Sequence, residues 1–513
     1  MTAPVLISEE KIDQNLNQAF GEATSWFVDA MLAEIPITES VGIPWVVVVL
    51  ILGATYFTIY FRFINIRSFF TAIQVVRGKY DTLENQEQKE SEESSSRVIS
   101  KAKDEADVNG EVSHFQALTT AVSATVGLGN IAGVAIALSI GGAGATLWMV
   151  IIGILGMSSK FVECTLGVKY REVDGTGKVF GGPMYYLSKG LGEKGYTQIG
   201  KVLSVLFAIM CIGGSFGGGN MFQVNQAFKL FNHVIVSENA MIHGQGWIFG
   251  LIMAILVGVV IIGGIKKIAS VTDKVVPFMV LTYIVSVLVV LVLYSSAIPA
   301  ACQAIWNGAF HPEGVLGGFV GVLVQGFRRG AFSNEAGVGS ASIAHSAVKT
   351  RFPASEGLVA LLEPFIDTVV VCTMTALVLI ITGQISTGVE INNEQGVLLT
   401  AAALESGVSW FPYLLTIAVL LFAFSSMISW SYYGYQAWSY LFGRGKRTEY
   451  VYKFIFCCFT VIGAAATLDA VTDFSDAMIF AMMVPNMVGL FLLSSKVKEE
   501  LKRYQKNIAA MIK

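Results

Sequence analysis

Residues 123–130 read Ser-Ala-Thr-Val-Gly-Leu-Gly-Asn, and residues 333–340 read Ser-Asn-Glu-Ala-Gly-Val-Gly-Ser. Each octapeptide interrupts a long apolar run with two glycines and several polar side chains. Inside a lipid bilayer, backbone that leaves helical geometry must be buried in protein or line a cavity, because unsatisfied N–H and C=O groups are costly there. The two octapeptides therefore predict two broken helices at the centre of the fold.

The composition around these breaks is that of an integral membrane protein. Of the 513 residues, 54% are hydrophobic and only 14% are charged, whereas soluble proteins carry about 25% charged residues. The apolar runs have the length of about 20 residues that an α-helix needs to cross a bilayer. Short alternating segments, which would indicate a β-barrel, are absent, and the net charge of -3 gives no reason to expect a nucleic-acid partner. The fold class is therefore all-α and polytopic.

The hydropathy pattern predicts about eleven transmembrane helices. They cover residues 44–63, 115–138, 143–160, 202–231, 247–264, 275–296, 314–347 (broken), 357–382, 409–442, 450–467 and 475–494. Lys and Arg are absent from every second connection and gather in the connections between them and in the tail after residue 495. By the positive-inside rule, the basic connections and the carboxyl terminus face the cytoplasm, and the amino terminus lies outside the plasma membrane.

The chain divides into six predicted parts. After one amino-terminal helix, ten helices form two groups of five, and each group opens with a broken helix. Because five is odd, the groups have opposite orientations and form an inverted repeat. The parts are an extracytoplasmic segment (1–43), an extra transmembrane helix and an interfacial helix (44–80), a charged cytoplasmic insert that is disordered or helical (81–112), two five-helix repeats (113–296 and 297–494) and a cytoplasmic tail (495–513). Within 64–77, alternating apolar and basic residues fit an interfacial helix or a simple extension of the first span.

The first break combines groups that suit a cation and a carboxylate. Unwinding at Gly127 and Gly129 frees carbonyl groups, including those of Ser123 and Val126, which are hard oxygen donors. It also frees the amides of Leu128 and Gly129 at the start of a half-helix, where an anion is favoured. The alternative is that the glycines only permit tight helix packing.

The second break carries a carboxylate, Glu335, at membrane depth. An ionisable side chain inside the membrane indicates a functional site, and its partner should be identified. Arg328 and Arg329 are the candidate partners, since they precede Glu335 by one to two turns. We expect a structural Glu335–Arg329 pair, with a proton relay as the alternative. Gly337 and Gly339 are expected to mirror the glycines of the first break.

Two further spans carry polar side chains at the same depth. Gln223 and Asn225 offer uncharged donors and acceptors that suit a zwitterion, although they would serve equally as hydrogen bonds between helices. Of the adjacent Ser425 and Ser426, at least one is expected to point inward, unless both bond to their own helix. Trp430, one turn later, walls a cavity or simply packs. The six cysteines show no metal-like spacing and are expected to be free thiols.

At these residues the sequence resembles the alanine/glycine:cation symporter family, which are sodium-coupled amino-acid carriers. The resemblance runs from about Phe115 to Leu493. It is carried by GLGNIAGVA (127–135), GGAGATLWM (141–149), KFVECTLGVKYREVDG (160–175), GGPMYYL (181–187), GGGNMFQVNQ (217–226), RRGAFSNEAGVGSASIAH (328–345), EPFIDTVVVCTMTAL (363–377) and SWSYYGYQAW (429–438). The chain departs from the family at 147–150, where LWMV stands for the usual FWMW, and in the long insert at 81–112.

The resemblance implies a leucine-transporter-like fold and a site for a small amino acid and a sodium ion. The implied substrate-binding residues are Gly127, Leu128, Gly129, Asn130, Gln223, Asn225, Phe332, Ser333, Asn334, Gly337, Gly339 and Trp430. The implied sodium ligands are the carbonyls of Ser123, Val126 and Phe422 and the hydroxyls of Ser425 and Ser426.

The expected function is sodium-coupled symport of alanine or glycine into the cell by alternating access, with the bilayer and the amino acid as the only inferred partners. Proton coupling through Glu335 or Asp367 is the alternative within carriers. A channel would need a continuous pore, and an enzyme would need a nucleophile or metal cluster that the sequence does not display. We therefore expect no enzymatic activity and no obligate protein partner.

Overall fold

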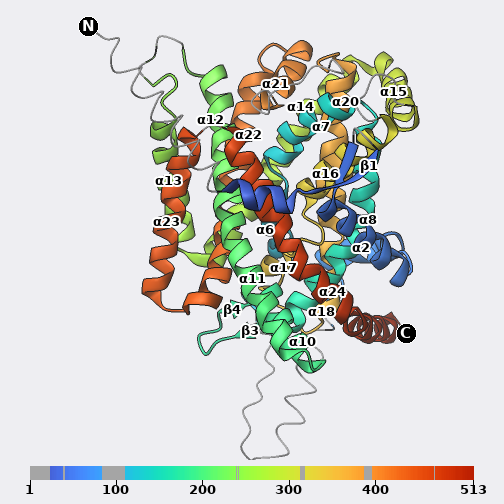
Figure 1. Ribbon diagram of the computed structural model, residues 1–513, viewed down its shortest axis with the longest axis vertical. Coiled ribbons are helices and arrows are strands. Elements are labelled where there is room, and N and C mark those ends of the chain that lie inside the picture. Colours follow the sequence, from blue (N-terminus) through green and yellow to red (C-terminus); the bar gives the residue numbers. More distant parts are fainter. Residues whose placement is uncertain are drawn as a thin grey trace, which may run out of the picture.

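The computed structural model describes residues 24–38, 41–81, 83, 110–237, 240, 242–311, 318–385, 396–466 and 468–512. Most of the predicted extracytoplasmic segment and of the charged insert therefore lies outside the described residues. The rest forms a helical bundle (Figure 1). Two small antiparallel hairpins accompany the helices: β1 (Glu34–Thr38) with β2 (Val41–Pro44), and β3 (Glu172–Val173) with β4 (Val179–Phe180).

The first half of the chain contains α2 (Trp45–Tyr60), α3 (Ile64–Arg67), α4 (Phe69–Val76), α6 (His114–Thr125), η1 (Leu128–Asn130), α7 (Ala132–Gly141), α8 (Ala145–Lys169), α9 (Pro183–Tyr185), η2 (Tyr186–Gly190), α10 (Leu191–Glu193), α11 (Thr197–Phe216), η3 (Gly217–Met221), α12 (Phe222–Val234), α13 (Gly246–Ile261) and α14 (Gly264–Leu293). The second half contains η4 (Ser295–Ala297), α15 (Ile298–Phe310), α16 (Gly318–Asn334), α17 (Ala341–His345), α18 (Pro353–Ala360), α19 (Leu362–Pro364), η5 (Phe365–Cys372), α20 (Thr373–Ile381), α21 (Gly396–Gly407), α22 (Phe411–Phe442), α23 (Lys446–Ala465) and α24 (Leu468–Ile512).

Several of these helices are long enough to cross a membrane. Among the described residues, seven helical segments are long and apolar enough to cross a bilayer, or eight if α6 and α7 form one bent span. Each of the eleven predicted ranges contains helix. The membrane-embedded, helical class is thus confirmed, while the count of eleven spans and the inverted repeat stay predictions.

Both predicted helix breaks are present. The first separates α6 from α7, whose axes are bent by 57°. The second runs between the end of α16 and the start of α17, and its backbone takes positive φ angles at Glu335 (52°), Gly337 (90°) and Gly339 (101°). Glycine adopts this left-handed region without the steric penalty that a Cβ brings. Gly337 and Gly339 are therefore explained by the backbone conformation that the second break requires.

The carboxyl-terminal helix is longer than the sequence predicts. α24 continues from Leu468 to Ile512 without a stop near residue 494. Its last turns are held by burial of Tyr504 and by an ion pair of 2.5 Å between Lys169 Nζ and Glu500 Oε1. The predicted tail is therefore a docked extension of the last helix. Figure 1 shows its end at the lower right of the bundle, below the label of α2.

Candidate functional site at the two helix breaks

The first break is held open by side chains that satisfy its backbone. Gly127 N donates to Asn130 Oδ1 at 2.8 Å, and Asn130 N donates back to Gly127 O at 3.2 Å. Leu128 N points to Gln223 Oε1 at 3.4 Å. Gln223 itself is held by its Nε2, which donates to Gly218 O at 3.0 Å. Because α6 ends at Thr125, these bonds replace the helical ones that the break removes.

The first break also contacts α22 through a cluster of serines. Ser426 Oγ donates to Ser123 O at 2.8 Å, and Ser123 Oγ donates to Ser425 O at 2.7 Å. Ser429, which the sequence did not single out, donates to Ser123 Oγ at 3.0 Å. Ser425 Oγ bonds back to its own helix at Phe422 O, at 3.1 Å. Of the two adjacent serines, Ser426 is thus the one whose hydroxyl reaches the broken helix.

Gly127 lies where three elements converge. A Cβ added there would be 2.9 Å from Ser426 Oγ and 3.1 Å from Gln223 Oε1. Both separations are shorter than nearly all contacts that a real Cβ makes, so a side chain would displace one of these polar groups. The residue therefore needs to be glycine for the serine cluster and Gln223 to reach the unwound backbone together.

Asn130 joins the first break to the second through a buried carboxylate. Its Nδ2 lies 2.7 Å from Asp367 Oδ1 in η5 and 3.0 Å from Ser333 Oγ in α16. Ser333 Oγ and Thr368 Oγ1 donate to Asp367 Oδ2 at 2.8 and 2.7 Å. The carboxylate thus accepts from three neutral donors. The sequence indicated Asp367 only as a proton carrier, although a carboxylate in the apolar run 365–372 is a visible signal.

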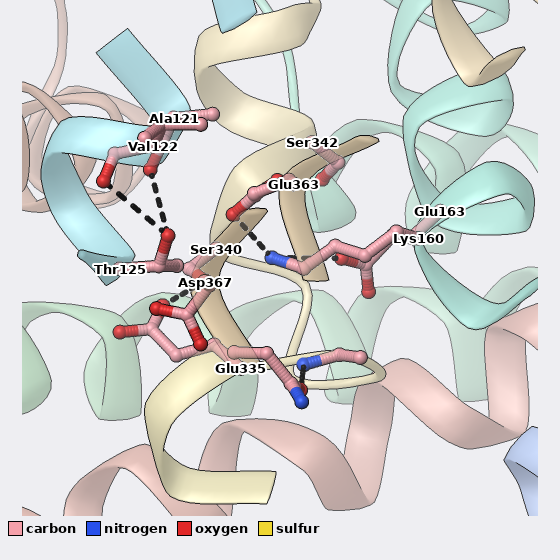
Figure 2. Close-up of polar contacts among 12 residues, drawn as sticks. Ala121, Val122, Thr125, Lys160, Glu163, Glu335, Ser340, Ser342, Glu363 and Asp367 are labelled. Atoms are coloured by element: carbon pink, nitrogen blue, oxygen red, sulfur yellow. Dashed lines mark hydrogen bonds and ion pairs between the residues drawn. The ribbon is translucent and has the colours of Figure 1, made fainter. Parts of the chain in front are cut away.

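The second break is stabilised differently from the expectation. Glu335 accepts a hydrogen bond of 2.5 Å from Ser340 Oγ across the turn (Figure 2). Arg329 lies 3.8 Å from Asp476 Oδ2, and Arg328 lies 3.3 Å from the same atom. The predicted Glu335–Arg329 pair is therefore wrong. Because α16 remains helical to Asn334, residues six apart on it point in directions about 120° apart around its axis.

Phe332 and Ser333 bring α16 beside Gly129. A Cβ on Gly129 would lie 3.9 Å from the Phe332 ring and 3.9 Å from the Ser333 Cα, which is ordinary contact. The Phe332 ring also contacts Phe222 and Phe480, each with centroids 6.3 Å apart. An aromatic cluster therefore borders the unwound backbone on this side, next to the polar bonds of Asn130.

The remaining predicted residues point elsewhere. The side chains or backbones of these residues contact elements other than the unwound segment of the first break. Their role in substrate binding stays a prediction. Asn225 Nδ2 donates to Gly463 O and Ala466 O at the end of α23; Asn334 Nδ2 donates to Thr368 Oγ1 in η5; Gly337 lies against Leu50 and Met487, and Gly339 against Pro183 and Asn486; Trp430 packs its ring on Gly219.

A buried ion network lies beside the second break (Figure 2). Lys160 Nζ is 2.8 Å from Glu363 Oε1 and 3.8 Å from Glu163 Oε1, and all three side chains are fully buried. The network continues from Glu363 through His345 and Glu356 to His114 at the start of α6. Lys160 thus neutralises carboxylates that a membrane-embedded bundle would otherwise tolerate poorly.

Two broken helices that are joined by polar groups inside a membrane bundle are typical of secondary active transporters. A family model described as the sodium:alanine symporter family matches residues 25–513. The chain belongs to this family, and its members are symporters and not enzymes.

Known relatives agree with this assignment. The chain is 41% identical to the sodium/alanine symporter AgcS of Methanococcus maripaludis over 409 residues, which covers 79% of this chain and 87% of that protein. It is 35% identical to the probable sodium/glutamine symporter GlnT of Bacillus subtilis, over 77% of this chain and 78% of the relative. The fold is similar to that of MhsT, solved in complex with L-phenylalanine, with a TM-score of 0.54 at 17% identity, over 76% of this chain and 92% of MhsT.

Proposed function

We propose that this protein carries alanine or glycine into the cell together with Na⁺, by alternating access in the plasma membrane, with the amino terminus outside and the carboxyl terminus in the cytoplasm. The observation that carries the proposal is the junction of Ser123 with Ser425 and Ser426, next to Gly127. It joins the last turn of α6, directly before the break, to the intact helix α22 through oxygen atoms alone.

The serine cluster supports a sodium site. A hard cation prefers oxygen ligands, and carbonyl and hydroxyl oxygens supply them without placing a net charge in the membrane. The proposed ligands are the carbonyls of Ser123, Val126 and Phe422 with the hydroxyls of Ser425 and Ser426. On binding, Na⁺ would take over the oxygens that now share the hydrogen bonds between α6 and α22.

The amide groups that follow Gly127 support an adjacent carboxylate site. Leu128 and Gly129 begin the helical turn of η1, where N–H groups and the helix dipole favour an anion. Gln223 Oε1, 3.4 Å from Leu128 N, would then act as a neighbouring acceptor. The ring of Phe332 lies close to Gly129, and so it would limit the size of the substrate side chain.

Coupling follows from the position of the proposed sodium ligands on two elements. An ion bound to both α6 and α22 favours the arrangement in which they are close, and that arrangement also fixes Gly127 beside the substrate amides. Each ligand therefore raises the affinity for the other. A monovalent cation that enters down the membrane potential releases about 2.3 kcal/mol per 100 mV, which is sufficient to concentrate a neutral solute.

The test is uptake of labelled alanine into proteoliposomes. An inward Na⁺ gradient should drive accumulation, and a membrane potential, inside negative, should increase it. Uptake that ignores the Na⁺ gradient and follows an imposed proton gradient would reject sodium coupling. Thermal stabilisation across a panel of amino acids, with Na⁺ or with choline as the counter-ion, should identify alanine or glycine as the preferred ligand.

Proton coupling is the second candidate, and one observation favours it. The carboxylate of Asp367 is buried and accepts from Asn130, Ser333 and Thr368, which are all neutral donors. A carboxylate at membrane depth that is held by neutral donors is a candidate proton carrier. Uptake by an Asp367→Asn variant that no longer responds to a proton gradient would support this candidate.

A further inference from the structure

A hollow of about 490 Å³ lies where the turn after α2 meets the last turns of α24. Four basic residues line it, and its lining contains no acidic residue: Arg62, Arg67, Lys498 and Lys502. Across the described ranges, none of the four has a carboxylate within ion-pair distance. Tyr60 and Ser68 also line it, and Lys498 Nζ lies 4.7 Å from the Tyr60 ring centroid.

Four uncompensated cations that converge on one hollow repel one another unless an anion is present. By contrast, Lys169 is paired with Glu500 and Lys496 lies 3.9 Å from Glu193 near this end of the bundle. The hollow differs from these places in holding four basic side chains that form no ion pair with any described residue. Its chemistry suits a phosphate group, which accepts several hydrogen bonds from guanidinium and ammonium groups at once.

The backbone at this place is also unusual. Arg62 and Phe63 have φ angles of 55° and 58°, in the left-handed region that non-glycine residues rarely occupy. These two successive residues follow the end of α2 and lead the chain into α3. Such conformations persist only where the surrounding structure requires them, and they occur often at ligand sites. Here the turn brings Arg62 into the hollow.

An exposed apolar strip runs next to the hollow. Phe63, Ile66 and Phe70 have 52%, 65% and 76% of their surface exposed. Their spacing of three and four residues places them on one side of the α3–α4 segment. Large apolar side chains beside a basic hollow are typical of a segment at the membrane interface, with the apolar side towards the acyl chains and the basic groups at headgroup level.

We propose that this hollow binds the phosphate of an anionic phospholipid from the leaflet that the positive-inside rule assigns to the cytoplasm. The headgroup lies between Arg62, Arg67, Lys498 and Lys502, and the acyl chains lie along Phe63, Ile66 and Phe70. A membrane lipid accounts for both the cations and the apolar strip, whereas a soluble anion accounts for the cations alone.

The lipid site bears on transport because it joins two helices that flank the second break. α2 and α24 each place one side chain against Gly337: a Cβ there would lie 3.0 Å from Leu50 Cδ2 and 3.2 Å from Met487 Cε. A headgroup that holds Arg62 after α2 and Lys498 on α24 fixes the spacing of these helices. Lipid binding is therefore expected to stabilise one arrangement of the second break and to change the uptake rate.

The test uses the full-length protein and phosphatidylglycerol as the probe. Thermal stability in detergent is titrated with phosphatidylglycerol for the wild type and for the double variants Arg62→Gln/Arg67→Gln and Lys498→Gln/Lys502→Gln. We expect each double variant to bind about tenfold more weakly, because every basic residue near the headgroup adds to the attraction. The charge-preserving variant Arg62→Lys/Arg67→Lys should keep most of the affinity, which separates loss of charge from loss of folding.

The matched control is Lys446→Gln/Arg447→Gln, which removes two charges from the same predicted membrane face at the start of α23. It should bind the lipid as the wild type does. An equal loss in this control would mean general surface attraction and would overturn the proposal. Stabilisation of the wild type by inorganic phosphate to the same extent as by the lipid would assign the hollow to a soluble anion and would also overturn it. In vesicles, phosphatidylcholine with phosphatidylglycerol should support faster uptake than phosphatidylcholine alone only when the four basic residues are intact.

Discussion

Asn130 Nδ2 lies 2.7 Å from Asp367 Oδ1 and 3.1 Å from Asp367 O, so this one amide group joins the first helix break to η5. Ser333, at the end of α16, donates to the other oxygen of the same carboxylate. One buried acid therefore organises the polar sides of both breaks. Any motion that separates α6 and α7 from α16 has to exchange these bonds, which makes Asp367 a sensitive point for both binding and conformational change.

Replacing Asp367 by Asn should reduce alanine uptake by tenfold or more. The substitution keeps the shape but removes charge-assisted hydrogen bonds, which are worth about 1.5–3 kcal/mol each. It also sets an amide against the Asn130 amide. Initial uptake rates in proteoliposomes measure the effect, and Glu405→Gln, at an exposed position, serves as the control for loss of a carboxylate. Undiminished uptake in Asp367→Asn would show that the carboxylate is only a packing element.

Replacing Ser426 by Ala should weaken Na⁺ binding about fivefold to tenfold, because a hydroxyl ligand and its bond to Ser123 O are lost. The apparent affinity for alanine at saturating Na⁺ should change far less. Uptake as a function of Na⁺ concentration gives both quantities. Ser439→Ala is the matched control, since the hydrogen bond of Ser439 Oγ runs to Gln436 O in its own helix, at 2.9 Å. Equal Na⁺ dependence in the two variants would rule out Ser426 as a ligand.

Replacing Gly127 by Ala should abolish measurable uptake. The new Cβ would come within 2.9 Å of Ser426 Oγ and would push apart the groups proposed to bind both ligands. Gly133→Ala in α7 is the control from the same broken span, because a Cβ there meets nothing within 4 Å. It should transport normally and gain up to about 1 kcal/mol of helix stability. Active Gly127→Ala protein would contradict the proposed crowding at the break.

Replacing Lys160 by Met should lower the thermal stability strongly. The change leaves Glu363 and Glu163 buried without their cation, and loss of one partner of a buried pair typically costs about 3–5 kcal/mol. The double variant Lys160→Met/Glu363→Leu should recover part of the loss because one of the two stranded charges is gone. Unfolding of the detergent-purified variants followed by fluorescence measures both. Additive losses in the double variant would indicate that the pair is not coupled.

The positions of both breaks could be predicted from the sequence because glycine pairs and polar side chains at membrane depth are costly unless the backbone leaves the helix inside the protein. The same reasoning failed for Glu335 and Arg329. Proximity along the chain suggested a pair, but α16 stays helical to Asn334 and directs Arg329 towards Asp476 on α24. A partner almost 150 positions away cannot be chosen from local spacing. Ser429 was missed for a related reason. Its contact with Ser123 depends on which way Ser429 points around the axis of α22, and the local sequence does not give that direction.

The amino-acid sequence by itself determined the membrane class, the two interruptions and the family, because hydropathy, glycine placement and long motifs are local properties of the chain. The tertiary structure alone decided which polar groups meet: Asn130 with Asp367, Ser426 with Ser123, and Lys160 with Glu363. Each of these contacts joins residues more than 200 positions apart. Such pairings depend on the rotation and depth of whole helices, which packing of the complete bundle fixes and which no single segment encodes.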